Sequence, residues 1–434
     1  MNEYIKNLKT PIAIVGMGRS GDAAKKLLKK AGVAAADIVT FDGKLSAVDF
    51  NDPNKLMSEA KPGTLVVSPG VPLASPWIQE AKKQGVHITS EISLACAFLT
   101  TERLIGVTGS VGKSTTVSLL GAGLAAFSPT SFVGGNLGIP FAEYAVGILE
   151  GTHPISEWVV LELSSYQLEN CEGLQLEYSI ITYFTSNHLE RYESLEHYYQ
   201  TKWKILSLTK KTLLLNKEGG DLVEYFKKCG STDQVEIVSR QDEKLKSLRL
   251  EQALLIGQHN QDNLAIASTL ALQAGWPHSA IEAMKKFTGL SHRLENLGVH
   301  RGVRFINDSK ATAMDSVLIA TTAAFDTLSN GGKLFVLLGG RDKNLPWHEL
   351  GTLSHFKGIE FVFFGECRQI AKEKSLLPGV SFNHLNEALD YIQSSVKSQD
   401  TVLLSPGGTS LDEFTSFEDR GNFFKKWVSS FSTL

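Results

Sequence analysis

Residues 104–120, LIGVTGSVGKSTTVSLL, constrain the fold of this 434-residue chain more than any other stretch. An apolar run ends at Thr108, a loop with glycines at 109 and 112 follows, and Lys-Ser-Thr at 113–115 opens a helix-compatible segment. A strand, a glycine loop and a helix in this order form a phosphate-binding loop, because backbone N–H groups at the helix N-terminus bind phosphate oxygens. The spacing departs from the common pattern, since Val107 stands at the first glycine position. We predict a nucleoside triphosphate site, with Lys113 at the β- and γ-phosphates and Ser114 on Mg²⁺.

Composition places the chain among ordinary globular proteins. Apolar residues make up 42% of the sequence and charged residues 21%, and the length suits about two to four domains with their own cores. The net charge of −3 gives no indication of a nucleic-acid partner or of binding to a membrane surface. The four cysteines form no C-x-x-C pair, so we expect neither disulfides nor a zinc site. Without an apolar run of signal-peptide or membrane-spanning length, we expect a cytoplasmic monomer that is not inserted in a membrane.

The N-terminal segment has the pattern of a nucleotide-binding βαβ unit. We expect strands at 11–15, 37–41 and 64–67, with glycines at 16, 18 and 21 in the first turn and Asp42 after the second strand. Such a turn lets a diphosphate approach the backbone, and the acid accepts hydrogen bonds from a sugar or a base. The pattern alone leaves open whether the ligand is NAD or another nucleoside diphosphate. The turn Ser-Pro-Gly-Val-Pro at 68–72 follows the third strand, at the edge of the sheet where ligands bind.

Two strands of the central segment end in residues that suit a metal site. Strand 158–161 ends at Glu162, where a carboxylate beside a phosphate-binding loop holds Mg²⁺. Strand 178–183 is followed by His188, for which a ligand role and a structural role are equally compatible with the pattern. We expect a helix over 195–211, on which Lys202 and Lys204 form a solvated face by pattern alone. A further helix over 264–274 is expected to have an asparagine cap, beginning at Asn260.

The C-terminal segment repeats the alternation of strands and helices. Strands are expected at 303–306, 333–338, 360–364 and 401–404, and each is followed by a loop of small or polar residues. Parallel α/β sheets build binding sites from such loops. The predicted fold class is therefore α/β with three domains: a Rossmann-like domain over 1–93, a central P-loop ATP-binding domain over 94–291 and a Rossmann-like domain over 292–434.

Taken together, the motifs resemble those of the bacterial Mur ligases over essentially the whole chain, and most strongly those of the members that add D-glutamate. Their order and spacing carry the resemblance. They are GVTGSVGKST (106–115), GGNLG (134–138), LELSSYQLE (161–169), NHLERY (187–192), the helix around Lys202, GQHNQDN (257–263), GLSHRLE (289–295), NDSKAT (307–312), LLGGRDK (337–343) and SPGGTSLDEFTSFEDRG (405–421). The last motif is the most informative about the amino acid that is added.

The resemblance implies an ATP-dependent amide ligase that adds D-glutamate to UDP-N-acetylmuramoyl-L-alanine through an acyl phosphate, in peptidoglycan precursor synthesis. It also implies that the N-terminal domain binds this UDP-sugar and not NAD, through Gly18, Arg19, Ser20, Asp42, Gly43, Lys44, Ser68, Pro69, Gly70 and Asn136. The implied ATP contacts are Ser110, Gly112, Lys113, Ser114, Thr115, Asn260, Asn263, Arg293, Asp308 and Lys310. The implied D-glutamate contacts, in the C-terminal domain, are Thr312, Lys343, Ser410 and Phe417.

By the same resemblance, two Mg²⁺ ions take part in the reaction. Ser114 and Glu162 are expected to hold one ion, and His188 and Lys202 the other, with Lys202 as a carbamate that turns a cation into an anionic ligand. The expected catalytic residues are Lys113, His188, Lys202 and Arg293.

The chain departs from the family pattern in four places. Val111 and Ala313 replace asparagines, Asn187 replaces an aspartate, and Gly-Gly-Thr at 407–409 replaces Ala-Cys-Ala. The alternatives are a sister Mur-type ligase that adds a different amino acid and an inactive nucleotide-binding regulator. A folylpolyglutamate synthase would not need the N-terminal glycine turn. An NAD-dependent dehydrogenase is disfavoured because nothing between Asp42 and Glu91 suggests a nicotinamide site.

Overall fold

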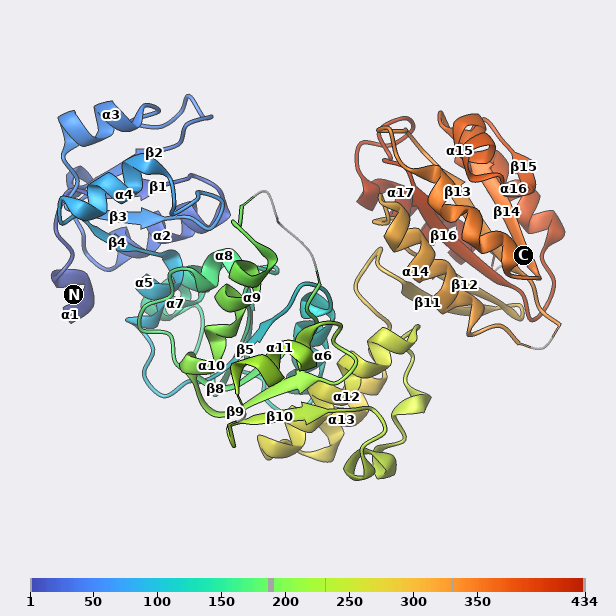
Figure 1. Ribbon diagram of the computed structural model, residues 1–434, viewed down its shortest axis with the longest axis horizontal. Coiled ribbons are helices and arrows are strands. Elements are labelled where there is room, and N and C mark those ends of the chain that lie inside the picture. The colour runs from blue at the N-terminus through green and yellow to red at the C-terminus, as the bar shows by residue number, and fades with distance from the viewer. Residues whose placement is uncertain (1, 186–190, 231, 330, 432–434) are drawn as a thin grey trace. The chain divides into compact units, whose positions relative to one another are not determined.

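The computed structural model describes residues 2–185, 191–230, 232–329 and 331–431 (Figure 1). It forms two compact units: residues 1–248 with 262–284, and residues 249–261 with 285–434. The first unit contains two β-sheets and the second contains one. All three sheets carry helices between their strands, so the predicted α/β fold class is confirmed. The domain boundaries at 93 and 291 stay a prediction.

The N-terminal sheet has four parallel strands in the order β2-β1-β3-β4, and their carboxyl ends share one edge. Its first three strands lie where the sequence predicted them, and the fourth falls in the stretch up to about residue 93 where strands and helices were expected to continue without stated bounds. The strands are β1 (Ile12–Val15), β2 (Ile38–Phe41), β3 (Thr64–Val67) and β4 (His87–Thr89), and the helices are α1 (Glu3–Lys6), α2 (Arg19–Lys30), α3 (Pro53–Lys55), α4 (Pro76–Lys83) and α5 (Glu91–Cys96).

The central sheet has six parallel strands in the order β10-β9-β8-β5-β7-β6. Strand β5 lies between β7 and β8, and Val107 pairs with Glu162, so Glu162 lies beside the loop that follows β5. The strands are β5 (Arg103–Thr108), β6 (Phe132–Gly135), β7 (Trp158–Glu162), β8 (Leu176–Ile181), β9 (Thr209–Asn216) and β10 (Val235–Val238). The helices are α6 (Lys113–Ala125), α7 (Phe141–Glu150), α8 (Ser165–Leu168), α9 (Leu195–Trp203), α10 (Ile205–Leu208) and α11 (Leu222–Cys229), and α12 (Gln258–Gln273) and α13 (His278–Lys285) follow along the chain.

Two helix predictions are wrong in their bounds. The helix expected over 195–211 ends as α9 and the short α10, and Thr209 begins strand β9. The reason is the apolar run Leu213–Leu215, which is fully buried between β8 and β10 and draws the preceding residues into the sheet. Helix α12 begins at Gln258, before the expected cap, and Asn260 Nδ2 donates to the carbonyl of Ile256 at 2.7 Å instead of capping the helix.

The C-terminal sheet has the order β11-β12-β16-β13-β14-β15, with β11 antiparallel to β12 and the other pairs parallel. Alternate residues of β13 enter two different apolar clusters, so both faces of the sheet are buried, as in a doubly wound domain. The strands are β11 (Glu295–His300), β12 (Val303–Asn307), β13 (Leu334–Gly339), β14 (Ile359–Phe364), β15 (Gly379–Ser381) and β16 (Thr401–Gly407), and the helices are α14 (Met314–Phe325), α15 (Arg368–Ser375), α16 (Leu385–Ser395) and α17 (Phe417–Phe431). In the part of the chain that the structure describes, none of the helices has the length and apolar character that crossing a membrane requires.

Candidate active site

The predicted phosphate-binding loop lies between β5 and α6, and Lys113, Ser114 and Thr115 form the first turn of α6. Gly109 has φ 148° and Gly112 has φ 87°, which L side chains rarely adopt. A Cβ on Gly109 would lie 2.1 Å from Thr182 Oγ1, and one on Gly112 would lie 2.8 Å from Asn263 Oδ1. The loop therefore requires glycine at both positions. The helix N-terminus that it exposes is a suitable site for phosphate oxygens.

Side chains of the loop are held by the protein itself. Lys113 Nζ donates to the carbonyls of Gly109 at 2.7 Å and Ser110 at 3.1 Å, so the ammonium group lies over the loop. The Ser110 hydroxyl donates to the carbonyl of Thr185 and accepts from Tyr198, and its backbone N–H donates to the carbonyl of Tyr183. Ser110 thus fastens the loop to the end of β8 and to α9, and its predicted contact with ATP stays a prediction.

Glu162 connects the phosphate-binding loop to the loop after β6. The carboxylate is 2% exposed. Ser114 Oγ donates to its Oε2 at 2.7 Å, and Asn136 Nδ2 donates to its Oε1 at 2.6 Å. The register of β7 against β5 and β6 places the three residues together. This chain of two hydrogen bonds joins a predicted ATP residue, a predicted metal ligand and a predicted UDP-sugar residue.

Lys202 is buried and does not form the solvated face that its pattern alone predicted. Its side chain is 1% exposed, and Nζ lies 4.8 Å from the centre of the Tyr198 ring. Burial lowers the pKa of Lys202 well below its ordinary value, the charge of Lys113 lowers it further, and Glu162 acts in the opposite direction. Lys202 is therefore a buried amine close enough to both residues to interact with their charges. Lys204, two residues on, is exposed.

A cavity of about 750 Å³ opens at the carboxyl edge of the N-terminal sheet and reaches the loop after β6. Every residue predicted to bind the UDP-sugar lines it, including Asn136 from the central sheet. The predicted residues are Gly18, Arg19, Ser20, Asp42, Gly43, Lys44, Ser68, Pro69, Gly70 and Asn136. The structure thus brings together ten residues that are far apart in the sequence, with Gly18 and Asn136 separated by 118 positions.

Hydrogen bonds to the backbone shape the glycine turn of this cavity. Asp42 accepts from the N–H of Met17 at 3.0 Å and of Lys44 at 2.9 Å, and these bonds lower its pKa. Ser68 Oγ donates to the carbonyl of Gly16 at 2.7 Å. A Cβ on Gly21 would lie 2.0 Å from the same carbonyl oxygen, so only glycine fits there. The carboxylate of Asp42 positions the turn, a role that the sequence pattern did not predict.

The predicted metal ligands are described only in part, because His188 and the departing residue Asn187 lie outside the described residues. No cluster of three or more His, Cys, Asp or Glu side chains suited to a metal occurs within the described ranges. The hydroxyl of Ser114 and the buried carboxylate of Glu162 nevertheless form an oxygen donor pair, the ligand type that Mg²⁺ prefers. These two residues fit a Mg²⁺ ion bound together with phosphates.

The second unit brings four predicted residues, Arg293, Asp308, Lys310 and Phe417, together near the ends of β12 and β16. Asp308 accepts from the N–H of Leu294 at 3.1 Å and from Ser405 Oγ at 2.9 Å, and burial raises its pKa to about 7. Lys310 Nζ lies 4.2 Å from the centre of the Phe417 ring. Burial, together with the charge of Arg293, lowers the pKa of Lys310. Phosphate and carboxylate groups would be attracted to these cations.

The predicted residues of this unit differ in exposure. Arg293, Thr312 and Lys343 are exposed, whereas Ser410 is 3% exposed and Asn260 is 6% exposed. A buried guanidinium group, Arg420, donates to the carbonyls of Ser309 at 2.9 Å and Gly408 at 3.2 Å. It connects the motif at 307–312 to the loop at 405–410. Burial lowers the pKa of Arg420 to about 10.

Sequence reasoning missed a group of residues in α8, at its end and shortly before α9. Arg191, Glu169 and Tyr166 lie in motifs quoted for the resemblance, LELSSYQLE and NHLERY, yet no role was assigned to them. Arg191 makes a salt bridge with Glu169 at 2.8 Å and lies 4.0 Å from the centre of the Tyr166 ring. The sequence offered one indication of this pair: Glu169 and Arg191 carry opposite charges in two successive family motifs.

Comparisons with known proteins identify the family. The Mur ligase middle domain family matches residues 107–271. A UDP-N-acetylmuramoylalanine–D-glutamate ligase of Elusimicrobium minutum is 32% identical over 96% of this chain and 97% of its own length. A protein of the same name from Pasteurella multocida is 33% identical over 98% and 99%. The chain belongs to the Mur ligase family. The resemblance to its D-glutamate-adding members is confirmed at this identity.

Solved structures of Mur ligases share the fold at lower identity. A UDP-N-acetylmuramoyl-L-alanyl-D-glutamate–2,6-diaminopimelate ligase has a TM-score of 0.58 at 17% identity and covers 99% of this chain and 93% of its own. A MurF ligase from Thermotoga maritima, solved in complex with ADP, has a TM-score of 0.57 at 15% identity, with 98% and 97% covered. At 15–17% identity, these structures support the fold of this Mur ligase and do not bear on its substrates.

Proposed function

We propose that this Mur ligase uses ATP to join D-glutamate to the L-alanyl carboxylate of UDP-N-acetylmuramoyl-L-alanine, a step of peptidoglycan precursor synthesis. Near-full-length relatives that carry this activity in their names support the substrates. The observation that carries the proposal is the hydrogen-bonded chain Ser114–Glu162–Asn136. It begins at the phosphate-binding helix and ends in the wall of the 750 Å³ cavity, so a phosphoryl donor and a UDP-sugar carboxylate can meet there.

The reaction needs a leaving group on the L-alanyl carboxyl carbon. A carboxylate oxygen attacks the γ-phosphorus of ATP, the bond to the bridging oxygen breaks, and an acyl phosphate and ADP form. The amine of D-glutamate then attacks the acyl carbon, the bond to phosphate breaks, and the nitrogen loses a proton. Both reactants of the first step are anions, so the site must supply positive charge where the phosphoryl group transfers. Lys113 and the helix N-terminus of α6 supply it from the loop.

Ser114 and Glu162 are the residues that would hold Mg²⁺, and bound Mg²⁺ neutralises phosphate charge. Ser114 can donate its hydroxyl proton to Glu162 and still offer lone pairs on the same oxygen, because a hydroxyl is both donor and acceptor. A second Mg²⁺ ion at His188 and a carbamylated Lys202 remains part of the proposal.

Lys202 has the properties that carbamate formation needs. A neutral amine adds CO₂ by forming an N–C bond and losing one proton, and the lowered pKa of Lys202 favours that neutral form. The product is a carboxylate at the end of a buried side chain. It would place a negative charge near Lys113 where the neutral amine carries none, which suits a metal ligand.

The test of the activity is phosphate release from ATP in the presence of UDP-N-acetylmuramoyl-L-alanine. D-glutamate, L-glutamate, L-lysine and diaminopimelate are added in parallel. We expect release that depends on D-glutamate alone. Release with another amino acid would make the protein a sister ligase of different specificity. No release with any of the four would favour a nucleotide-binding regulator and overturn the proposal.

The test of the carbamate is chemical rescue. We expect Lys202→Ala to lose activity and to regain part of it when a short-chain carboxylic acid is added, because the acid places a carboxylate where the carbamate stood. Lys204→Ala is the matched control, since its exposed side chain lies two positions away, and we expect it to retain activity without added acid. Full activity of Lys202→Ala would refute the carbamate.

A further inference from the structure

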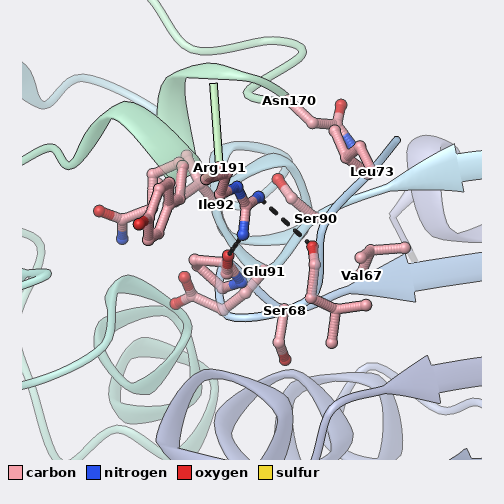
Figure 2. A pocket seen from close by; sticks show the side chains of 12 residues that line it. Val67, Ser68, Leu73, Ser90, Glu91, Ile92, Asn170 and Arg191 are labelled. Carbon is pink, nitrogen blue, oxygen red and sulfur yellow. Dashed lines mark hydrogen bonds between the residues drawn. The ribbon is translucent and has the colours of Figure 1, made fainter. Parts of the chain in front are cut away.

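Arg191 lies between the central sheet and the turn at the end of β3. Its side chain is 10% exposed. It reaches across to the turn at 68–72, more than a hundred positions earlier in the sequence, and donates to the carbonyls of Pro69 at 2.9 Å and Val71 at 3.4 Å (Figure 2). We propose that Arg191 is a positioning residue that fixes the turn Pro69–Val71 in the shape that binds the UDP-sugar, an inference that rests on the proposed function.

The guanidinium group is itself held in place on two sides. Its Nε and a terminal nitrogen donate to the two carboxylate oxygens of Glu169 at 3.2 and 2.8 Å. Tyr192 also donates to Glu169, at 2.8 Å, and the ring of Tyr166 lies under the guanidinium plane at 4.0 Å. A planar fork with five donors can satisfy a carboxylate and two carbonyls together, which a lysine ammonium cannot do in the same geometry. Arg191 therefore links the turn by hydrogen bonds to Glu169 at the end of α8, so the position of one depends on the other.

The turn has one face toward Arg191 and another toward the ligand cavity. Ser68, Pro69 and Val71 line the 750 Å³ cavity, and they also line a hollow of about 10 Å³ beside Arg191. The turn is closed by a hydrogen bond from Val71 N–H to the carbonyl of Ser68 at 3.0 Å. Arg191 supplies side-chain donors to the carbonyls of Pro69 and Val71. Its loss is expected to let this part of the turn change shape, while Ser68 stays held by its bonds to Val15 and Gly16.

Arg103, the first residue of β5 in the central sheet, provides a matched control. It makes the same type of pair with Glu177, at 2.8 Å through both Nε and a terminal nitrogen, and lies 3.8 Å from the centre of the Trp158 ring. It lines neither the cavity nor the hollow. Arg103→Lys and Arg191→Lys thus each remove a bidentate pair with a glutamate beside an aromatic ring, at a side chain that is 33% exposed for Arg103 and 10% for Arg191. Only the second variant also removes the donors to the turn.

The experiment measures binding in the absence of turnover. The dissociation constants of UDP-N-acetylmuramoyl-L-alanine and of a non-hydrolysable ATP analogue are determined by calorimetry for wild type, Arg191→Lys, Arg191→Ala and Arg103→Lys. Amide hydrogen exchange is followed in the peptide that covers 64–72. We expect both Arg191 variants to bind the UDP-sugar about tenfold more weakly or worse, as the loss of charged hydrogen bonds predicts. The turn should exchange faster, and affinity for the ATP analogue should stay unchanged.

The outcomes separate two kinds of failure. If wild type binds no UDP-sugar, the proposed function fails and the inference fails with it. If wild type binds the UDP-sugar and Arg191→Lys binds it as tightly, with the turn exchanging at the wild-type rate, only the inference is overturned. An equal loss of UDP-sugar affinity in Arg103→Lys would also overturn it, because the effect would then be a general loss of structure.

Discussion

Replacement of Lys202 by methionine is expected to stabilise the protein locally while abolishing its activity. The pKa of Lys202 lies well below the ordinary value of 10.5 because the side chain is buried beside Lys113. The unfolded chain therefore binds a proton that the folded state does not, at every pH between the folded pKa and 10.5. Stability rises with pH across this window by about 1.4 kcal/mol per pH unit. Lys202→Met has no titrating group at this position, so its stability does not depend on pH in this way. The free energy of unfolding of the variant therefore exceeds that of wild type most at low pH, and the difference falls with the same slope as pH rises.

The free energy of local opening is measured for wild type and Lys202→Met by amide hydrogen exchange in peptides from α9. The buffer is free of CO₂, several pH values are used, and the rates are corrected for intrinsic exchange. Exclusion of CO₂ keeps the amine free of the carbamate. Lys204→Met is the control, and we expect it to change the free energy of opening by less than about 0.5 kcal/mol at any pH. A variant Lys202→Met that opens more easily than wild type, or an advantage that does not vary with pH, would refute the reasoning.

Three further predictions concern stability and binding away from the metal site. Gly21→Ala forces its Cβ against the carbonyl of Gly16, 2.0 Å away, so UDP-sugar affinity measured by calorimetry should fall at least about tenfold with ATP-analogue affinity unchanged. Arg420→Leu leaves the carbonyls of Ser309 and Gly408 without their buried donor and should destabilise the adjoining β16 by about 1–3 kcal/mol in hydrogen exchange, whereas the exposed Lys426→Met should not. Burial raises the pKa of Glu91 to about 7 from an ordinary 4.5, so the stability it contributes is present below pH 4.5 and is lost as pH rises through 7. Above pH 7, Glu91→Gln should therefore have a free energy of opening of α7, measured by hydrogen exchange, that is roughly 3 kcal/mol higher than that of wild type. A difference between the two proteins that does not change with pH would contradict this.

The parts of the fold predicted well were those that depend on a run of neighbouring residues. Strand β5, the loop after it and the start of α6 follow from an apolar run, two glycines and a lysine that are close together in the sequence. The ends of parallel strands meet at one edge, so the sequence pattern alone assigns the residues after β1, β2 and β3 to one binding site. The resemblance to a family added Asn136 to this site, which no local pattern could have done.

The parts predicted poorly depend on partners that are distant in sequence. The pattern around Lys202 is that of a solvated helix face, and only the packing of α9 against the central sheet buries it. Strand β9 begins within the expected helix because β8 and β10 offer it hydrogen bonds, and local propensity carries no information about them. Arg191 was missed because its partners at the turn are carbonyl groups, which every residue has, so no pairing of residue types could reveal them.

The chain Ser114–Glu162–Asn136 gives a physical reason for treating the ATP and UDP-sugar sites as one. A carboxylate that is 2% exposed requires hydrogen-bond donors, and Glu162 has one donor from the phosphate-binding helix and one from the wall of the UDP-sugar cavity. A change at either donor alters the position and charge balance of Glu162, and through it the other donor. In the proposed reaction, substrate and phosphates would therefore both act on Glu162, and the acceptor carboxylate of the UDP-sugar would lie close to the γ-phosphoryl group.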